Sequence, residues 1–139
     1  ALQLINFWQD LSLDLPRGRI YVTVADAADA GLSVHGLTAG ADTEATRVLV
    51  RALVAWARQT MLDGAALVHR MPGRMAWELR FVVQGGLRVL DKIEASGCNA
   101  LSQRPTVGIA DLPLLAWRAL AMARPLPSTR TAISTDPRL

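Results

Sequence analysis

The sequence predicts an all-α fold, and three observations favour this class. The chain is rich in Ala, Leu, Arg and Val and only 5% aromatic, which suits helices better than sheets built from β-branched and aromatic residues. Apolar residues also recur at helical spacing through two long stretches, residues 43–70 and 74–96. A length of 139 residues is enough for one domain with one core, and we expect that domain to span residues 1–124.

The first helix is predicted over residues 2–14, which read LQLINFWQDLSLD. Its apolar side carries Leu4, Trp8 and Leu11. Three side chains with oxygen atoms repeat every fourth residue on another side: Asn6, Asp10 and Asp14. Pro16 and Gly18 end this helix. Residues 15–42 contain several glycines, so we expect connecting loops there, with a short helix near residues 25–30.

A long helix is predicted from a cap at Asp42 or Thr43 to about Arg70. Its apolar positions keep helical spacing: Val50, Leu53, Val54, Ala57 and Met61. The opposite face carries three arginines, which we interpret as a solvated stripe rather than a ligand site: Arg47, Arg51 and Arg58. Pro72 and Gly73 then make a turn.

A second long helix is predicted over residues 74–96. Eight residues form its expected core face: Met75, Leu79, Val82, Val83, Gly86, Val89, Leu90 and Ile93. Gly86 lies at the centre of this face, where the lack of a side chain allows another helix to approach closely. Trp77 and Phe81 lie on the other side, so they either pack against another helix or line an apolar substrate channel.

The C-terminal part of the chain follows a break at Gly97. A last amphipathic helix is predicted over residues 110–123, after a loop that contains the sequence SQRP. Beyond Pro125 the chain is rich in Pro, Ser and Thr. We therefore expect residues 125–139 to form a disordered tail.

Charge and cysteine content exclude several classes of protein. The net charge of +3 is spread along the chain instead of gathered into a block, which argues against a nucleic-acid partner. The single cysteine, Cys98, cannot form an internal disulfide, and neither it nor His35 and His69 stands at metal-ligand spacing. No apolar run reaches the roughly 20 residues of a transmembrane helix. We expect a cytoplasmic protein that is soluble or peripherally bound to a membrane.

Asp10 and Asp14 are the leading candidates for chemistry. Side chains one helical turn apart have Cβ atoms about 5–6 Å from each other, so two carboxylates there can hold Mg²⁺ and leave positions open for phosphate oxygens. Asn6 adds an amide oxygen on the same side. Three further polar side chains follow on the loop: Arg17, Arg19 and Tyr21. The same acidic spacing also occurs on solvated helix faces, so the pattern alone leaves both interpretations open.

The run from Asn6 to Tyr21, NFWQDLSLDLPRGRIY, resembles the second aspartate-rich motif of the squalene and phytoene synthase family. That motif is an N-x-x-x-D-x-x-x-D helix followed by a G-R-x-Y turn. Residues 67–105, with HRMPGR, WELR, QGGLRVLDKIEASG and a closing RP, resemble the C-terminal helices of the hydroxysqualene synthase branch. The resemblance covers nearly the whole chain and identifies it as similar to the C-terminal half of a bacterial member.

The resemblance implies the C-terminal part of the isoprenoid synthase helical bundle. It implies that Mg²⁺ binds at Asp10 and Asp14, with Asn6 as a further ligand. It also implies substrate-binding roles for five residues: Asn6, Gln9, Arg17, Arg19 and Tyr21. The implied reaction converts presqualene diphosphate to hydroxysqualene with release of diphosphate, in squalene or hopanoid biosynthesis. The family's first aspartate-rich motif would lie before Ala1, in an N-terminal half that we expect to complete the domain.

Two other functions stay open. One is head-to-head prenyl transfer that yields presqualene diphosphate, squalene or phytoene. Gln9 stands where other branches usually have Arg, and Leu13 where some have an acidic residue, so these positions count against squalene or phytoene synthase. The other is a non-catalytic helical module that completes its bundle by association. No Gly-rich dinucleotide fingerprint supports a role for NADPH.

Overall fold

The structure is a computed structural model that describes residues 1–38 and 42–122, and every regular element in these ranges is helical. The predicted all-α class is therefore confirmed. The α-helices are α1 (Leu2–Gln9), α2 (Leu11–Asp14), α3 (Val24–Asp29), α4 (Val34–Thr38), α5 (Glu44–Ala65), α6 (Gly73–Ala95) and α7 (Leu112–Ala121). Short 3₁₀ segments lie at Leu15–Arg17, Ala66–His69 and Ile109–Asp111. The predicted tail, 125–139, lies outside the described residues.

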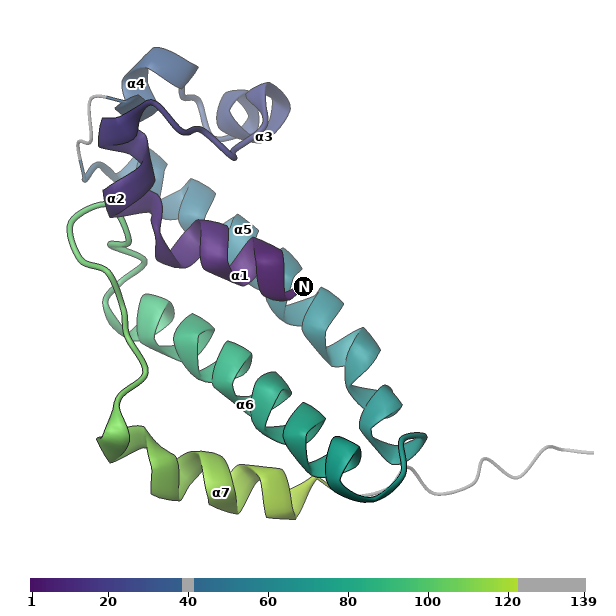
Figure 1. The fold of residues 1–139 in the computed structure, drawn as a ribbon. Helices are drawn as coiled ribbons and strands as arrows, with labels where there is room; N and C mark the ends of the chain where they lie inside the picture. The colour runs from purple at the N-terminus through teal and green to yellow at the C-terminus, as the bar shows by residue number, and fades with distance from the viewer. Residues whose placement is uncertain (39–41, 123–139) are drawn as a thin grey trace, which may run out of the picture.

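The long helices α5 and α6 form the frame of the fold (Figure 1). Helix α1 packs against both of them, and α7 packs along another side of α6. Helices α2, α3 and α4 gather at the end of the molecule where α5 begins. Side chains of α1, α5 and α6 meet in one apolar core, in which Trp8, Val54 and Leu90 are almost completely buried.

Gly86 lies where side chains of α1 and α5 pack directly against α6. A Cβ atom at this position would lie 2.8 Å from Met61 Cε and 3.0 Å from Ile5 Cδ1. A side chain at this position would displace the ends of Met61 and Ile5, so glycine is what lets these two side chains lie directly on α6. The predicted close approach at Gly86 is confirmed.

Helix α5 begins at a cap that is built from two threonines. The hydroxyl of Thr43 accepts a hydrogen bond from the N–H of Thr46 at 3.2 Å, and the hydroxyl of Thr46 accepts one from the N–H of Thr43 at 2.8 Å. Asp42, the alternative cap, instead pairs with Arg47 at 2.6 Å. The α-helix ends at Ala65, and its predicted continuation toward Arg70 is a 3₁₀ segment.

Two predictions need correction, one about a connecting segment and one about the arginine face of α5. Helix α4 occupies residues that we expected to form loop; the Ser33 hydroxyl accepts a hydrogen bond from the Gly36 N–H at 3.0 Å, and Leu37 is buried. The arginine face of α5 is also more than a solvated stripe. Arg58 Nη2 lies 3.0 Å from Asp91 Oδ1 and 2.8 Å from Glu94 Oε2, so it links α5 to α6.

The predicted core face of α6 is correct at its centre and wrong in two places. Met75 and Val82 are 49% and 40% exposed, whereas Gln84 and Leu87 are buried. Helix α7 packs against α6 as well, so α6 has a second covered side that the apolar periodicity alone did not reveal. Trp77 and Phe81 remain 44% and 42% exposed among the described residues, so the choice between helix packing and a channel wall stays open.

Asp111 joins the start of α7 to α6 through a buried ion cluster. Its side chain is 6% exposed and lies 2.8 Å from Arg88 Nε and 2.6 Å from Lys92 Nζ. The N–H of Gly108 donates a third hydrogen bond to it at 2.8 Å. These donors, Lys92 foremost, hold the pKa of Asp111 well below its usual range and outweigh the opposing effect of burial.

Replacing Asp111 is expected to change how stability depends on pH. A carboxyl group whose pKa is lower in the folded chain contributes stability above its unfolded pKa of about 3.9, and that contribution disappears as pH falls through the folded pKa. Asp111→Asn should therefore lower the free energy of unfolding at pH 7, and its difference from the unmodified protein should narrow below about pH 4. Urea unfolding at pH 7 and pH 3 measures this. An equal difference at both pH values would contradict the assignment.

No helix within the described ranges is long and apolar enough to cross a membrane.

Candidate functional site

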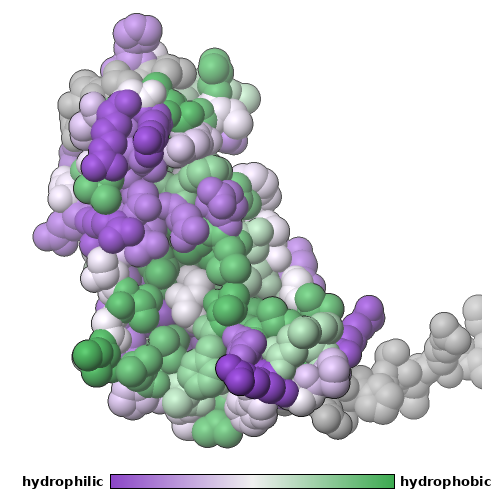
Figure 2. All heavy atoms as spheres, viewed as in Figure 1, coloured by the Kyte–Doolittle hydropathy of each residue, from purple (hydrophilic) through white to green (hydrophobic). Residues whose placement is uncertain are grey.

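The site predicted from the sequence lies in one polar hollow of about 430 Å³ beside α1 and α2. All seven predicted site residues line it: Asn6, Gln9, Asp10, Asp14, Arg17, Arg19 and Tyr21. Gln3, Phe7, Leu13 and Arg104 complete the lining. Figure 2 shows strongly hydrophilic residues gathered around α2 at this end of the molecule. The structure thus brings together the residues that the sequence singled out, and adds one arginine from a distant segment.

The two aspartates do not share one straight helix, which corrects the prediction of a single helix over residues 2–14. The chain bends at Asp10, where φ is −99° and ψ is 10°, and α2 starts in a new direction (Figure 1). The Asp10 carbonyl oxygen accepts hydrogen bonds from the N–H groups of Leu13 and Asp14, both at 2.9 Å. This short turn keeps the side chains of Asp10 and Asp14 on the same hollow despite the bend.

A left-handed glycine returns the chain to the aspartates after α2. Gly18 has a φ of 71°, and its N–H donates to the Leu15 carbonyl at 3.0 Å. The next N–H, that of Arg19, donates to the Asp14 carbonyl at 3.0 Å. The Arg19 guanidinium then lies 3.6 Å from Asp14 Oδ1. The G-R sequence therefore places a cation beside a predicted metal ligand.

Gly18→Ala is expected to lower the free energy of unfolding by about 1 kcal/mol, because a side chain disfavours left-handed backbone. Denaturant unfolding measures the change. Gly64→Ala is the matched control, since Gly64 lies in α5 with ordinary helical backbone and has no neighbouring atom within 4 Å of its Cβ position. That variant should be neutral or slightly stabilising. Equal losses in both variants would show that the Gly18 turn carries no backbone constraint.

Tyr21 is held over α1 by an aromatic stack. Its ring lies parallel to that of Phe7, with centroids 3.9 Å apart and an interplanar angle of 9°. Phe7 in turn makes an edge contact with the buried Trp8. The motif's tyrosine is thus positioned by a neighbour inside the same motif.

Arg104 is the site residue that sequence reasoning missed. Its Nε lies 2.5 Å from Asp10 Oδ1, although 94 residues separate the two in the chain. The Asp10 carboxylate raises the pKa of Arg104, which keeps this guanidinium charged. The closing RP pattern was the only available signal, and nothing in its spacing from Asp10 indicated the contact.

Gln9 takes part in holding the Arg104 segment. Its amide Nε2 donates to the carbonyl oxygen of Pro105 at 2.6 Å. Gln9 is a predicted substrate-binding residue, and in the structure its amide nitrogen donates to the neighbouring loop. Three guanidinium groups and two carboxylates now face the hollow, a set that suits a phosphate group together with a cation.

An apolar groove of about 550 Å³ adjoins the polar hollow. The two share Asn6, Gln9 and Arg104, while the rest of the groove is mainly apolar: Leu2, Ile5, Val82, Gly85, Gly86, Val89, Thr106 and Val107. Figure 2 shows the matching band of hydrophobic residues between α1 and α6. A ligand with a charged head and a long apolar tail fits this arrangement of surfaces.

The donor set of the hollow fits Mg²⁺. Asp10, Asp14 and Asn6 offer oxygen atoms, which are the ligands that this ion prefers. Within the described part of the chain, no group of three or more Asp, Glu, His or Cys side chains comes together as a metal site. Two carboxylates are nevertheless a usual protein contribution to Mg²⁺, because water and substrate phosphates complete its coordination.

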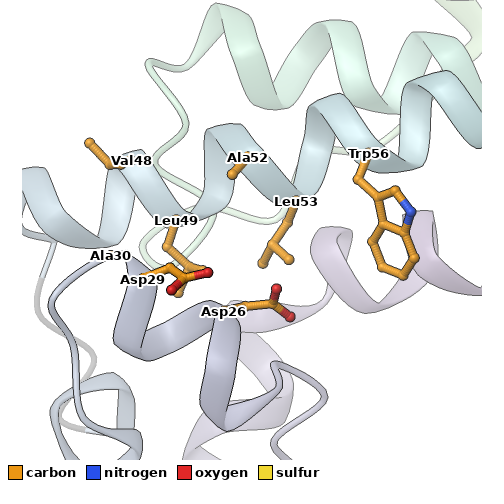
Figure 3. Close-up of a pocket in the computed structure, with 8 residues that line it drawn as sticks. All are labelled: Asp26, Asp29, Ala30, Val48, Leu49, Ala52, Leu53 and Trp56. Atoms are coloured by element: carbon orange, nitrogen blue, oxygen red, sulfur yellow. The ribbon is translucent and has the colours of Figure 1, made fainter.

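Another hollow, between α3 and α5, is a weaker candidate (Figure 3). Asp26 and Asp29 of α3 face an apolar floor formed by Leu49 and Leu53, with the indole of Trp56 at one end. No basic side chain lines it, so it offers nothing to neutralise a phosphate. The polar hollow at α1 and α2 therefore remains the candidate site.

Comparison with known proteins gives one consistent result. The profile of the family described as Squalene/phytoene synthase matches residues 1–111. The chain is 34% identical to a phytoene synthase of Thermus thermophilus over 125 residues, which is 89% of this chain and 43% of that protein. It is 32% identical to the chloroplastic phytoene synthase 1 of Arabidopsis thaliana, over 82% of this chain and 28% of that protein.

The chain thus spans less than half the length of these curated relatives. No solved structure gave a significant match. The family profile covers both the aspartate motif and the long helices α5 and α6. The chain belongs to the squalene/phytoene synthase family.

Proposed function

We propose that the protein takes part in head-to-head coupling of prenyl diphosphates, as an isoprenoid synthase of the phytoene or squalene type. The observation that carries this proposal is the junction of the polar hollow with the apolar groove at Asn6, Gln9 and Arg104. A prenyl diphosphate has the same two parts, a charged head and a hydrocarbon tail. The names of the relatives, which are phytoene synthases, support this type of reaction.

In this proposal the polar hollow binds the diphosphate. Asp10 and Asp14, with the amide oxygen of Asn6, hold Mg²⁺, whose charge when bound offsets that of the departing diphosphate. Arg19 and Arg104 already pair with these two aspartates, so their guanidinium groups are placed to contact phosphate oxygens. Arg17 lines the same hollow and adds positive charge. Loss of diphosphate leaves an allylic cation on the prenyl chain.

The apolar groove shelters that cation and the tail. Val82, Gly86 and Val89 offer no base to the cation, and their apolar surface would exclude water from the reactive carbon once the open side of the groove is covered. The groove and the hollow are both open on one side in the described residues. We propose that an N-terminal part of the whole protein, carrying the family's first aspartate-rich motif, supplies the facing wall and further metal ligands.

Hydroxysqualene synthase is the second candidate function. Gln9, Leu13 and the QGG and KIE sequences of α6 favour it. In that reaction presqualene diphosphate loses its diphosphate, and a water molecule captures the resulting cation. Gln9 lies where the polar hollow meets the groove, which is where the charged head and the hydrocarbon tail of the substrate would join.

The test is product identification with the full-length protein and Mg²⁺. Prenyl diphosphates of 15 and 20 carbons and presqualene diphosphate are supplied separately, and the lipid products are identified by mass spectrometry. A coupled hydrocarbon or presqualene diphosphate supports head-to-head transfer. Hydroxysqualene formed only from presqualene diphosphate establishes the second candidate. No Mg²⁺-dependent product from any substrate would contradict both and favour a non-catalytic helical module.

A further inference from the structure

The segment that carries Arg104 has no helix of its own to hold it. Residues 99–108, between the end of α6 and the 3₁₀ segment Ile109–Asp111, run back along α6 without α-helix. Two successive carbonyl oxygens in this segment are fixed from outside it. Gln9 Nε2 donates to Pro105 at 2.6 Å, and Lys92 Nζ donates to Thr106 at 2.7 Å. The loop is thus attached to α1 on one side and to α6 on the other.

Lys92 is itself held in one orientation. Its ammonium group lies 2.6 Å from Asp111 Oδ2, and the Asp111 carboxylate is fixed by Arg88 and by the Gly108 N–H, both at 2.8 Å. The backbone that carries Lys92 belongs to the last turn of α6, a helix that packs against both α5 and α7. A cation anchored this firmly can set the position of the Thr106 carbonyl, and with it the chain two residues from Arg104.

We propose that Lys92, oriented by Asp111, is a positioning residue that holds Arg104 at the polar hollow; this inference rests on the proposed function of Arg104 as a diphosphate contact. Lys92 does not line the hollow and acts only through the Thr106 carbonyl. Arg104 reaches Asp10 from a segment without helix, so its guanidinium can take the productive geometry only if that segment is fixed.

The test is a double-mutant cycle in the full-length protein. Binding of inorganic diphosphate is measured by calorimetry at fixed Mg²⁺ for the unmodified protein, Lys92→Met, Arg104→Gln and the double variant. Lys92→Met should raise Kd about tenfold in the unmodified background, the size typical for loss of a partner that orients a binding group. In the Arg104→Gln background it should cause no further change, because Lys92 acts through Arg104.

Several outcomes would overturn the inference. An unchanged Kd in Lys92→Met, or the same increase in both backgrounds, rules out a role through Arg104. An unchanged Kd in Arg104→Gln alone overturns the assignment of Arg104 and the positioning role together. If Arg104→Gln raises Kd and Lys92→Met leaves it unchanged, only the positioning role is overturned. Failure of the positioning role can therefore be distinguished from failure of the Arg104 assignment.

Controls separate positioning from general stability. Arg118→Met breaks the 2.7 Å ion pair between Arg118 and Asp91 at the same α6–α7 contact and leaves the Arg104 loop untouched. It should lower the melting temperature without changing Kd. Lys92→Arg keeps a cationic donor and should restore most of the affinity. If Lys92→Met does not stay folded, the milder change Lys92→Gln takes its place in the same double-mutant cycle.

Discussion

Asp10→Asn and Asp14→Asn are each expected to reduce turnover of the full-length enzyme by at least about 100-fold. Each change removes one charge from the group that holds Mg²⁺ against the departing diphosphate, and loss of a single stabilising group at a centre of developing charge costs roughly 3 kcal/mol. Folding should survive, because asparagine has nearly the same size as aspartate and each replacement leaves the other ion pair of the hollow in place. Steady-state assays over a range of Mg²⁺ concentrations measure the effect.

Asp29→Asn is the matched control for these variants. Asp29 is an exposed carboxylate of α3 that faces the other hollow and lies outside the polar one. Its replacement should leave turnover and the Mg²⁺ requirement unchanged. Near-normal activity in Asp10→Asn or Asp14→Asn would instead assign that aspartate to a solvated helix face, and the proposed metal site would fail.

Gly86→Leu is expected to lower the free energy of unfolding by about 1–3 kcal/mol, the usual cost of overpacking a dense core. Its Cβ alone would lie 2.8 Å from Met61 Cε and 3.0 Å from Ile5 Cδ1, so these two side chains must shift, and the rest of the leucine must then be accommodated in the packed contact with α1 and α5. Chemical denaturation monitored by circular dichroism measures the change.

The adjacent glycine offers a sharp control for this prediction. Gly85 shares the same helix, but no neighbouring heavy atom lies within 4 Å of its Cβ position. Gly85→Leu should therefore be neutral or stabilising, because leucine favours the helix more than glycine does. If both variants lower the free energy of unfolding by the same amount, the loss arises from the helix backbone. The close contact at Gly86 would then not be its cause.

Asp91 shows why ion pairs of this fold were hard to predict. Its carboxylate lies 3.0 Å from Arg58 of α5 and 2.7 Å from Arg118 of α7. Burial opposes the charged form, but the two guanidinium groups prevail and lower the pKa of Asp91. Each residue could be placed on its own helix from the sequence, whereas their meeting depends on how three helices pack.

The sequence by itself determined what depends on residues close together in the chain. Helical periodicity predicted α5 and α6, and the spacing of Asn6, Asp10 and Asp14 with the following G-R-x-Y turn identified side chains that do line one hollow. Gly86 was identified as a close approach because its place among apolar neighbours is a local property. Their roles in binding metal and diphosphate remain predictions.

Only the tertiary structure decided which distant residues complete the site. The Arg104–Asp10 pair, the Gln9–Pro105 contact and the Lys92–Asp111 cluster join segments with no shared periodicity. The second buried side of α6 likewise appears only once α7 packs on it. Local spacing fixes where a side chain points on its own helix, but contacts between helices follow from packing of the whole core, which no single stretch of sequence contains.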